Sequence, residues 1–314
     1  MTNPTQTVKQ AAKKWVRPAL TPAVRWAVRH APREGIRRPL WTGVVLPFFQ
    51  YSQKNFVVTT VFGATISGNT RDIIQRHIYY FGVWEPNLTS FLATRLHEGD
   101  VFVDVGANIG YFTLLASRLV GRTGEVRAIE ASPMTYARLV DHIARNHATN
   151  IEAVNAAVSD RPGTARIFRG SESNIGATGI VPKSGRRYEC EVAADRLDSL
   201  LPPTSLSRVR FVKIDVEGAE WLVIDGMRDL LKHGQESLEI LVELQPKSLK
   251  EHGKCVEDVV RLFAEFGFRP YRIENDYSVV SYMSPHATRR PVRMRSPIST
   301  QTDVIFSRID AEHL

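Results

Sequence analysis

The chain has 314 residues, a formal net charge of +8 and 43% hydrophobic residues. This hydrophobic content, with no low-complexity tract, predicts a globular chain and excludes a disordered one, and the lack of an apolar run of about eighteen residues predicts no transmembrane helix. Two cysteines, Cys190 and Cys255, cannot make a disulfide framework, so we expect free thiols in a cytoplasmic protein.

All of the net charge lies at the N-terminus. Residues 1–40 hold nine of the 41 Lys and Arg residues and one of the 33 acidic residues. Trp15 and Trp26 are interleaved with these basic residues, a composition typical of peripheral contact with an anionic membrane. Several prolines break long helices and equally favour a solvated arm, so both interpretations stay open. The protein is therefore expected to be cytoplasmic, with a possible peripheral membrane contact through this segment.

The segment after the arm predicts a hairpin followed by helices. Residues 56–66 form the hairpin, and residues 72–81 and 87–96 carry apolar residues at helical spacing. We divide the chain into three parts: a basic arm over 1–50, an N-terminal hairpin and helices over 51–98, and a catalytic domain over 99–310.

The most informative segment follows. Residues 101–105 form an apolar strand that delivers Asp104 to its carboxyl end, where open α/β sheets bind ligands. Gly106 and Gly110 then let the backbone turn tightly and approach a bound molecule. Asn108 stands where a dinucleotide fingerprint has its middle glycine, which argues against a pyrophosphate and a nicotinamide-dependent oxidoreductase. The turn favours a cofactor with a ribose, an amino group and no phosphates.

A second short strand over 125–130 ends in another carboxylate. Glu130 can accept hydrogen bonds from both hydroxyls of a ribose bound across the first turn. The alternative is that Glu130 caps the helix that begins near Pro133. Together with Asp104, the interpretation as a cofactor contact is preferred.

A third strand-to-helix junction is rich in acids. The strand that includes residues 211–214 is followed by Asp215, Glu217 and Glu220, and then by a helix over 221–233. We assign Asp215 and Glu217 as candidate bases because they lie at the predicted ligand edge; a helix cap is the alternative for Asp215. Glu217 and Glu220 are three apart and are expected to face the same side of the helix. Oxygen ligands of this kind suit Mg²⁺, but we assign no metal ligand.

The region between the third and fourth strands is longer than a simple crossover. Residues 166–168 and 188–192 predict an antiparallel hairpin around a polar loop over 170–185. Loops of this length and composition are often binding loops, so we expect the acceptor here. Four side chains are available to hold an anionic or glycan acceptor, or are equally well solvated: Asn174, Lys183, Arg186 and Arg187.

The remaining elements complete an alternating pattern of strands and helices. This pattern predicts an α/β, doubly wound and mostly parallel sheet. Glu243, which closes a later strand, is a third possible site carboxylate. The basic residues over 289–295 leave open the alternative that the acceptor is a polyanion. The remaining predicted elements are strands over 151–157, 238–244, 269–273 and 303–307, and a helix over 256–266.

The motifs taken together resemble the FkbM family of S-adenosylmethionine-dependent methyltransferases. The resemblance spans roughly residues 56–307. It implies a Rossmann-like, seven-stranded methyltransferase sheet whose final strand is antiparallel, with S-adenosylmethionine as the cofactor. It also implies methyl transfer to a hydroxyl oxygen of a sugar, glycan or natural product. The strings that carry the resemblance are 104–111 (DVGANIGY), 130–133 (EASP), 155–160 (NAAVSD), 195–198 (DRLD) and 213–220 (KIDVEGAE).

Asp215 and Glu217 are the expected catalytic residues, and the expected partner is a small-molecule or glycan acceptor, with no obligate protein partner. An RNA methyltransferase is disfavoured because no Asp/Asn-Pro-Pro-Tyr type string is present, and a non-catalytic adenosyl-ligand binding protein is disfavoured because the acids are intact. The expected cofactor-binding residues are Asp104, Gly106, Ala107, Asn108, Gly110, Tyr111, Glu130, Ala131, Val158 and Asp215.

Overall fold

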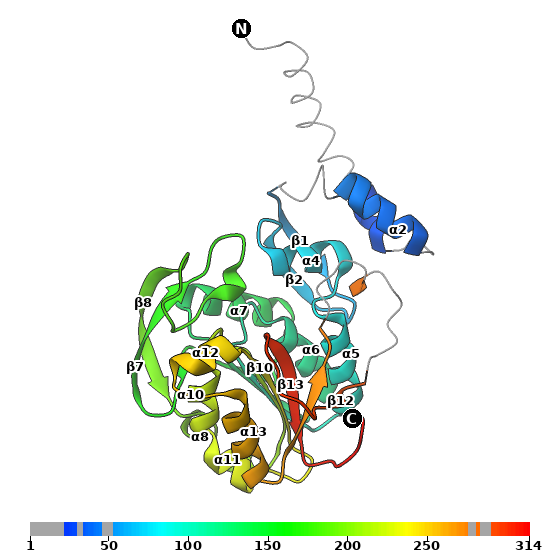
Figure 1. The fold of residues 1–314 in the computed structure, drawn as a ribbon. Coiled ribbons are helices and arrows are strands. Elements are labelled where there is room, and N and C mark those ends of the chain that lie inside the picture. The colour runs from blue at the N-terminus through cyan, green and yellow to red at the C-terminus, as the bar shows by residue number, and fades with distance from the viewer. Residues whose placement is uncertain (1–21, 30–33, 46–52, 276–280, 283–289) are drawn as a thin grey trace, which may run out of the picture. The chain divides into compact units, whose positions relative to one another are not determined.

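A computed structural model describes residues 22–29, 34–45, 53–275, 281–282 and 290–314 (Figure 1). The chain divides into two compact units, which we describe separately. Unit 1 comprises Met1–Pro86 with Asp276–His286, and unit 2 comprises Asn87–Asn275 with Ala287–Leu314. Most of the predicted basic arm, and with it the expected membrane contact, lies outside the described residues.

Unit 1 contains the predicted hairpin. Strands β1 (Asn55–Thr59) and β2 (Thr65–Asn69) pair antiparallel, with Thr59 opposite Thr65. Helix α4 (Ile73–Phe81) follows, and its N-cap Asp72 accepts a hydrogen bond from the Gln75 amide at 2.9 Å. The unit also contains helix α2 (Glu34–Leu40) and a π-helix over Trp41–Val45.

One arginine closes the C-terminal end of α4. The last carbonyls of a helix lack partners within the helix, and Arg29 donates to those of Ile78, Tyr79 and Tyr80 at 3.0–3.1 Å. It also donates to the Thr59 carbonyl at 3.3 Å. Arg29 thereby fastens the short helix over residues 22–29 to the hairpin and α4.

Unit 2 is built on one large mixed sheet. Strands β3, β4, β5, β9 and β10 are parallel, and β13 runs antiparallel between β10 and β11. The predicted doubly wound fold with an antiparallel final strand is therefore confirmed. In spatial order the strands are β12 (Val292–Arg293), β11 (Arg269–Ile273), β13 (Thr302–Ser307), β10 (Glu239–Leu244), β9 (Val209–Ile214), β3 (Val101–Val105), β4 (Glu125–Ile129) and β5 (Ile151–Val154).

Helices cover both faces of this sheet (Figure 1). On one face, Val103 and Val105 belong to a buried cluster with α10, α11 and α13; on the other, α6 contacts β3 and β4, and α7 contacts β5. Strand β3 is buried at every position, as expected of a central parallel strand. The helices are α5 (Pro86–Arg95), α6 (Tyr111–Val120), α7 (Pro133–Arg145), α8 (Leu197–Leu200), α9 (Pro203–Leu206), α10 (Glu220–Asp225), α11 (Arg228–His233), α12 (Pro246–Glu251) and α13 (Val256–Glu265).

The sheet has eight strands where seven were predicted. The additional strand, β12, has two residues and pairs antiparallel with β11 at the edge. It lies within the basic segment over 289–295, where no strand was predicted, since two residues are too short to produce an alternating pattern in the sequence. Two arginines of this segment are paired: Arg293 contacts Asp310 at 3.1 Å and Arg295 contacts Glu312 at 2.5 Å.

The predicted strand over 151–157 is wrong at its C-terminal end. Strand β5 ends at Val154, and the side-chain amide of the next residue, Asn155, donates to the carbonyls of Glu130 and Ala131 at 2.8 and 3.1 Å. The chain then enters a separate three-stranded sheet. That sheet has the order β6 (Ala157–Val158), β8 (Arg187–Asp195) and β7 (Gly163–Arg169), with β7 and β8 forming the predicted hairpin.

The predicted helix over 221–233 is in fact two helices, α10 and α11, separated at Gly226. A Cβ at Gly226 would lie 2.0 Å from the carbonyl oxygen of Ser159, so the chain passes too closely here for a larger residue. The N-terminus of the second helix is capped by a carboxylate that is distant in the sequence: Asp198 accepts hydrogen bonds from the amides of Asp229 and Leu230, both at 3.0 Å. An acidic cap of this kind satisfies orphan donors at a helix N-terminus.

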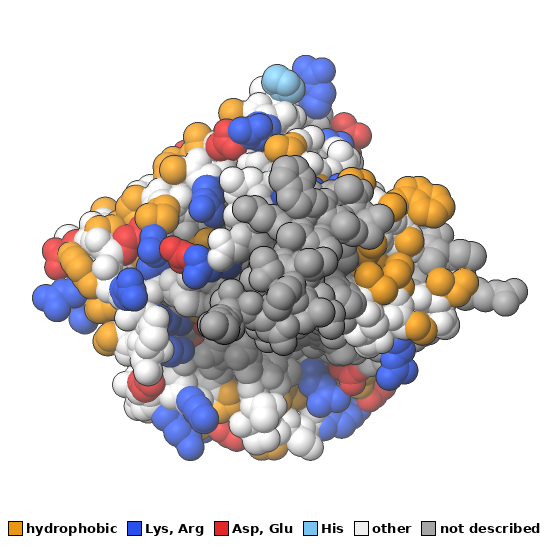
Figure 2. Space-filling view, turned by 90° about the horizontal axis from the view of Figure 1, so that it is seen from above, with side chains coloured by type: hydrophobic (Ala, Val, Ile, Leu, Met, Phe, Trp, Pro, Cys, Tyr) orange, Lys and Arg blue, Asp and Glu red, His pale blue; other side chains and the backbone are white. Residues whose placement is uncertain are grey.

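The described surface carries both signs of charge. On the face drawn in Figure 2, Lys and Arg side chains are interspersed with Asp and Glu side chains and do not gather into one patch. Among the described residues, no helix combines the length and apolar character needed to cross a bilayer. Cys190 and Cys255 are both free thiols, as expected.

Candidate active site

The turns after β3 and β9 meet at the carboxyl edge of the sheet. The Asp215 amide donates to the Val105 carbonyl at 3.0 Å, and a Cβ at Gly106 would lie 1.9 Å from the Asp215 carbonyl oxygen. Gly106 also has φ +81°, a left-handed conformation that favours glycine. The first turn therefore needs glycine at this position for the third acidic junction to lie against it.

Asn108 adopts a left-handed backbone conformation at the position where a dinucleotide fingerprint has its middle glycine. It has φ +51°, and asparagine tolerates the left-handed region better than most residues. Its side-chain oxygen accepts from the Ile109 backbone amide at 2.8 Å, and its own backbone amide donates to the Glu130 carboxylate at 2.8 Å. A Cβ at Gly110 would lie 2.6 Å from Leu139 Cδ1, so Gly110 allows the close packing of α7.

Glu130 joins the first turn to the start of α7. Its carboxylate accepts from the amides of Asn108 and Ser132, at 2.8 and 2.9 Å. Burial raises the pKa of Glu130 to about 7, although these two amides oppose the shift. The helix cap itself is Ser132, whose hydroxyl accepts from the Thr135 amide. Because only these two amides in the described part of the chain donate to it, the Glu130 carboxylate keeps further lone pairs that can accept hydrogen bonds from a ligand.

Asp104 is fully buried at the end of β3. One of its oxygens accepts from the Thr113 hydroxyl at 2.6 Å. The other, Oδ1, is buried and has no hydrogen-bond partner among the described residues. Burial raises the pKa of Asp104, and the nearby charge of Lys213 opposes that shift. A buried acceptor without a donor destabilises the folded protein unless a ligand supplies that donor.

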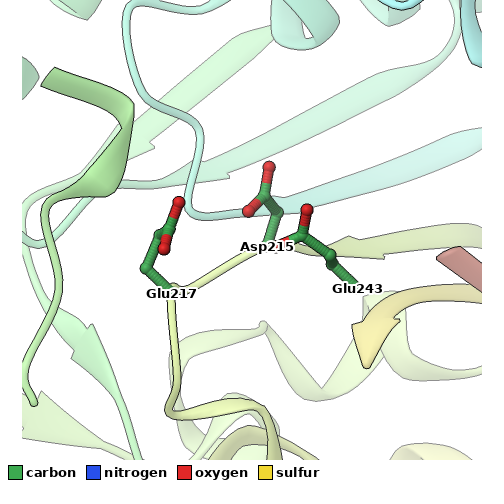
Figure 3. Close-up of side chains that lie close together, drawn as sticks. All are labelled: Asp215, Glu217 and Glu243. Atoms are coloured by element: carbon green, nitrogen blue, oxygen red, sulfur yellow. The ribbon is translucent and has the colours of Figure 1, made fainter. Parts of the chain in front are cut away.

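Three further carboxylates converge beside this turn. Figure 3 shows Asp215 and Glu217, from the loop after β9, and Glu243, from β10, pointing into the same space. Carboxylate oxygens of the three lie within 4.8 Å of one another. Oxygen donors at this spacing are compatible with one Mg²⁺ ion. Lys213 contacts Asp215 through a 3.0 Å ion pair.

The crowding of these acids changes their protonation. Burial, followed by the charges of Asp215, Asp303 and Glu217, raises the pKa of Glu243 to about 10. Burial and Asp215 raise the pKa of Glu217 to about 7, while Arg186 and Lys183 oppose the shift. Glu243 is therefore expected to hold a proton at neutral pH, whereas Glu217 is expected to be partly ionised there.

Glu217 and Glu220 do not share a helix face as expected. Glu217 precedes the helix at φ +57°, whereas Glu220 is the first residue of α10. The Glu220 carboxylate is buried and accepts from the Gly218 amide at 2.8 Å, so it braces the loop. Ala219 occupies the N-cap position, which removes the interpretation of Asp215 as a helix cap.

The sequence missed one acid of the edge. Asp303 lies directly opposite Glu243 in the antiparallel pairing of β13 with β10. Burial raises its pKa to about 6, and Asn275 donates to it at 2.6 Å. The register of two strands about sixty residues apart places it there, and no local pattern signals that register.

The other expected cofactor-binding residues lie in the elements of this edge. The Ala107 amide donates to the Ile129 carbonyl at 3.0 Å, and the Tyr111 hydroxyl lies 3.2 Å from that of Thr89. Ala131 accepts from Asn155, and Val158 is buried in β6. Their contact with the cofactor stays a prediction.

Comparison with known proteins decides the family. Residues 104–270, more than half of the chain, match the methyltransferase FkbM domain. The chain belongs to the FkbM methyltransferase family. It is thus a methyltransferase that uses S-adenosylmethionine, and the matched segment runs from the first turn of the sheet into β11.

Two curated relatives and one solved structure illustrate the similarity. The 31-O-demethyl-FK506 methyltransferase FkbM of Streptomyces tacrolimicus is 27% identical over 164 residues, covering 43% of this chain and 62% of that protein. The hexuronic acid methyltransferase AglP of Haloferax volcanii is 27% identical over 196 residues, covering 61% and 78%. The structure of M. jannaschii TYW2 with AdoMet has a TM-score of 0.41 at 14% identity, covering 82% and 88%.

Proposed function

We propose that this FkbM methyltransferase transfers a methyl group from S-adenosylmethionine to a hydroxyl oxygen of a sugar, glycan or natural product. The observation that carries the proposal is the convergence of Asp215, Glu217 and Glu243 beside the Gly106 turn. A hydroxyl acceptor must lose a proton, and this edge supplies carboxylates to receive it. Two relatives, a 31-O-demethyl-FK506 methyltransferase and a hexuronic acid methyltransferase, support this acceptor class.

The donor set of the first turn suits the cofactor. The buried Asp104 Oδ1 offers an acceptor that needs a donor, and Glu130 offers further lone pairs beside the Asn108 amide. Such acceptors match the hydroxyls of a ribose and an amino group, whereas they would repel phosphates. Gly106 and Gly110 would lie against the cofactor without side chains. S-adenosylmethionine supplies an electrophilic methyl group on a sulfonium.

The chain's part in the reaction is to align the acceptor and take its proton. Alignment within reach of the donor can supply much of the rate enhancement of a displacement. Glu217 is a suitable proton acceptor because its raised pKa, about 7, lies near the working pH. Asp215, held by Lys213, is the second candidate and neighbours it through their carboxylates.

Calorimetry tests the cofactor assignment first. S-adenosylmethionine, S-adenosylhomocysteine and NAD are titrated into the wild type, into Asp104→Ala, and into Asp141→Ala as a control on the exposed side of α7. We expect micromolar binding of the adenosyl ligands to the wild type and the control, and its loss in Asp104→Ala. Binding of NAD alone would overturn the assignment of these residues.

An acceptor screen tests the chemistry. Glucuronic acid oligosaccharides, neutral sugars and macrolides are incubated with S-adenosylmethionine, and methylated products are detected by mass spectrometry. The wild type should form an O-methyl product, and Asp215→Asn should form none while still binding S-adenosylhomocysteine. Full turnover by Asp215→Asn would remove it as a base.

A further inference from the structure

The acceptor loop, residues 179–187, lies directly on the acidic edge. Gly179 forms a bridge with Phe168 through hydrogen bonds of 2.9 and 3.1 Å. A Cβ at Gly179 would lie 3.2 Å from the carbonyl oxygens of both Val216 and Glu217. The loop is therefore packed against the peptide that carries a candidate base, and a glycine allows this approach.

Two cations of the loop converge on Glu217. Arg186 donates to the Glu217 carboxylate at 3.2 Å and, through both terminal nitrogens, to the Glu217 carbonyl at 3.3 Å. Lys183 donates to the same carbonyl at 3.3 Å, and to the side chains of Gln245 and Ser248 at 3.3 and 3.2 Å. These contacts join the loop to the ends of β9 and β10.

The Arg186–Glu217 pair is protected from water. The Arg186 side chain is 5% exposed and that of Glu217 is 25% exposed. On the same hairpin, Arg166 and Glu191 form a pair whose side chains are 71% and 53% exposed. Exposed pairs contribute little, whereas breaking a desolvated pair leaves an uncompensated charge. The chain thus offers a partly buried pair and an exposed counterpart for direct comparison.

The backbone of Glu217 is held in an unfavourable conformation. It adopts φ +57°, which for a non-glycine residue costs about 1–2 kcal/mol. A conformation of this kind persists where surrounding contacts hold it, and here the hydrogen bonds from Arg186 and Lys183 to the Glu217 carbonyl do so. Gly218 follows at φ +114°, with Lys183 Nζ 2.9 Å from where a Cβ would lie.

We propose that Arg186 is a positioning residue for methyl transfer. It holds the Glu217 carboxylate and the left-handed Glu217 peptide in place, and through the same contacts docks the acceptor loop onto the acidic edge. Lys183 donates to the same carbonyl at 3.3 Å and supports it together with Arg186. The mechanistic part rests on the proposed function, since it takes Glu217 as a proton acceptor.

Hydrogen–deuterium exchange of the full-length protein tests the positioning without an acceptor. Exchange is followed at residues 179–187 and 216–219 in the wild type, Arg186→Met, Arg186→Lys, Glu217→Gln and the matched control Arg166→Met. Arg186→Met should speed exchange at both segments by about tenfold or more, and Arg166→Met should leave both unchanged. Arg186→Lys should restore part of the protection.

A double variant tests whether the two residues act as one unit. Glu217→Gln alone should speed exchange in the acceptor loop, and Arg186→Met added to it should speed exchange by less than the two single effects combined. Unchanged exchange at 216–219 in Arg186→Met, or additive effects in the double variant, would overturn the proposal.

Turnover then separates positioning from mere folding. With an acceptor found in the screen, Arg186→Met should lower kcat by about tenfold or more while the calorimetric affinity for S-adenosylhomocysteine stays within about threefold. Arg186→Lys should recover part of kcat. Unchanged kcat would overturn the mechanistic role. If no acceptor is methylated by the wild type, the proposed function fails, and exchange still decides the positioning.

Discussion

Strand β10 carries a glutamate near each end, and their surroundings are opposite. Glu239, at the amino edge of the sheet, is 1% exposed and is neutralised by Arg95 and Arg210, with Ser307 donating to it as well. Glu243, at the carboxyl edge, is 9% exposed and faces other carboxylates. The same residue type, buried in the same strand, is paired with arginines at one edge and crowded by other acids at the other.

The difference separates a structural edge from a chemical one. At the amino edge the charges are paired, which suits a part of the molecule that only has to hold together. At the carboxyl edge an excess of acids gathers with raised pKa values, a pattern common where chemistry is carried out. Each prediction below compares the two edges or changes one of them.

The largest effect is expected from glycine substitutions. Gly106→Ala places a Cβ 1.9 Å from the Asp215 carbonyl oxygen, whereas Gly267, at the same φ of +81° in the loop that enters β11, has open space around it. Gly267→Ala should lower the free energy of unfolding by about 1 kcal/mol from backbone strain. Gly106→Ala should lower it by more than about 4 kcal/mol, measured by urea denaturation. Equal losses would contradict the close contact.

The next effect is on turnover. Glu217→Gln should lower kcat by about 10²–10⁴-fold, since it removes a candidate proton acceptor. In the wild type, kcat should rise with pH through about 7, because Glu217 accepts a proton only when ionised. The control is Glu236→Gln, an exposed residue near the amino edge. A kcat that stays constant from pH 5 to 9 in both the wild type and the Glu236→Gln control would exclude Glu217 as the proton acceptor.

A third comparison concerns Glu239. Glu239→Gln leaves Arg95 and Arg210 without their charge partner, and their side chains are only 20% and 12% exposed. Breaking a buried ion pair costs about 3–5 kcal/mol, and water at the partly exposed arginines reduces this to about 2–3 kcal/mol. Urea denaturation at pH 7.5 measures the loss. Unchanged stability would show that the arginines find other partners.

The smallest effect has the opposite sign. The folded state holds a proton on Glu243 between pH about 4.5 and about 10, whereas the unfolded chain releases it, so stability falls as pH rises through that window. Glu243→Gln, whose amide resembles the protonated acid, should therefore stabilise the protein by about 1–3 kcal/mol at pH 7.5. The gain should vanish at pH 4. A loss at pH 7.5 would show that Glu243 is ionised there.

Local patterns of the sequence were enough for the first turn. The apolar run of β3, the glycines and Asp104 lie within ten residues, so their spacing alone predicts a strand, a turn and a ligand edge. The same holds for Asp215 and Glu217, which follow a buried strand directly. The doubly wound, mostly parallel sheet follows from the alternation of strands and helices, and its antiparallel final strand from the FkbM resemblance.

Contacts between distant segments set the features that the sequence did not reveal. The helix break at Gly226 depends on the carbonyl of Ser159, and the place of Asp303 depends on a strand register. Arg186 was expected to face an acceptor or solvent, and it binds Glu217 because the β7–β8 hairpin folds back over the edge. A short window of sequence never contains both partners of such a contact.

Asn108 has a consequence for how a ligand is received. Its side chain closes the turn onto the Ile109 amide while its own amide is held by Glu130, so the loop is already ordered before anything enters it. Glycine in the same place would have more conformational freedom to lose. A ligand meeting this turn would therefore bind a preorganised surface, and its association should involve little loss of backbone entropy.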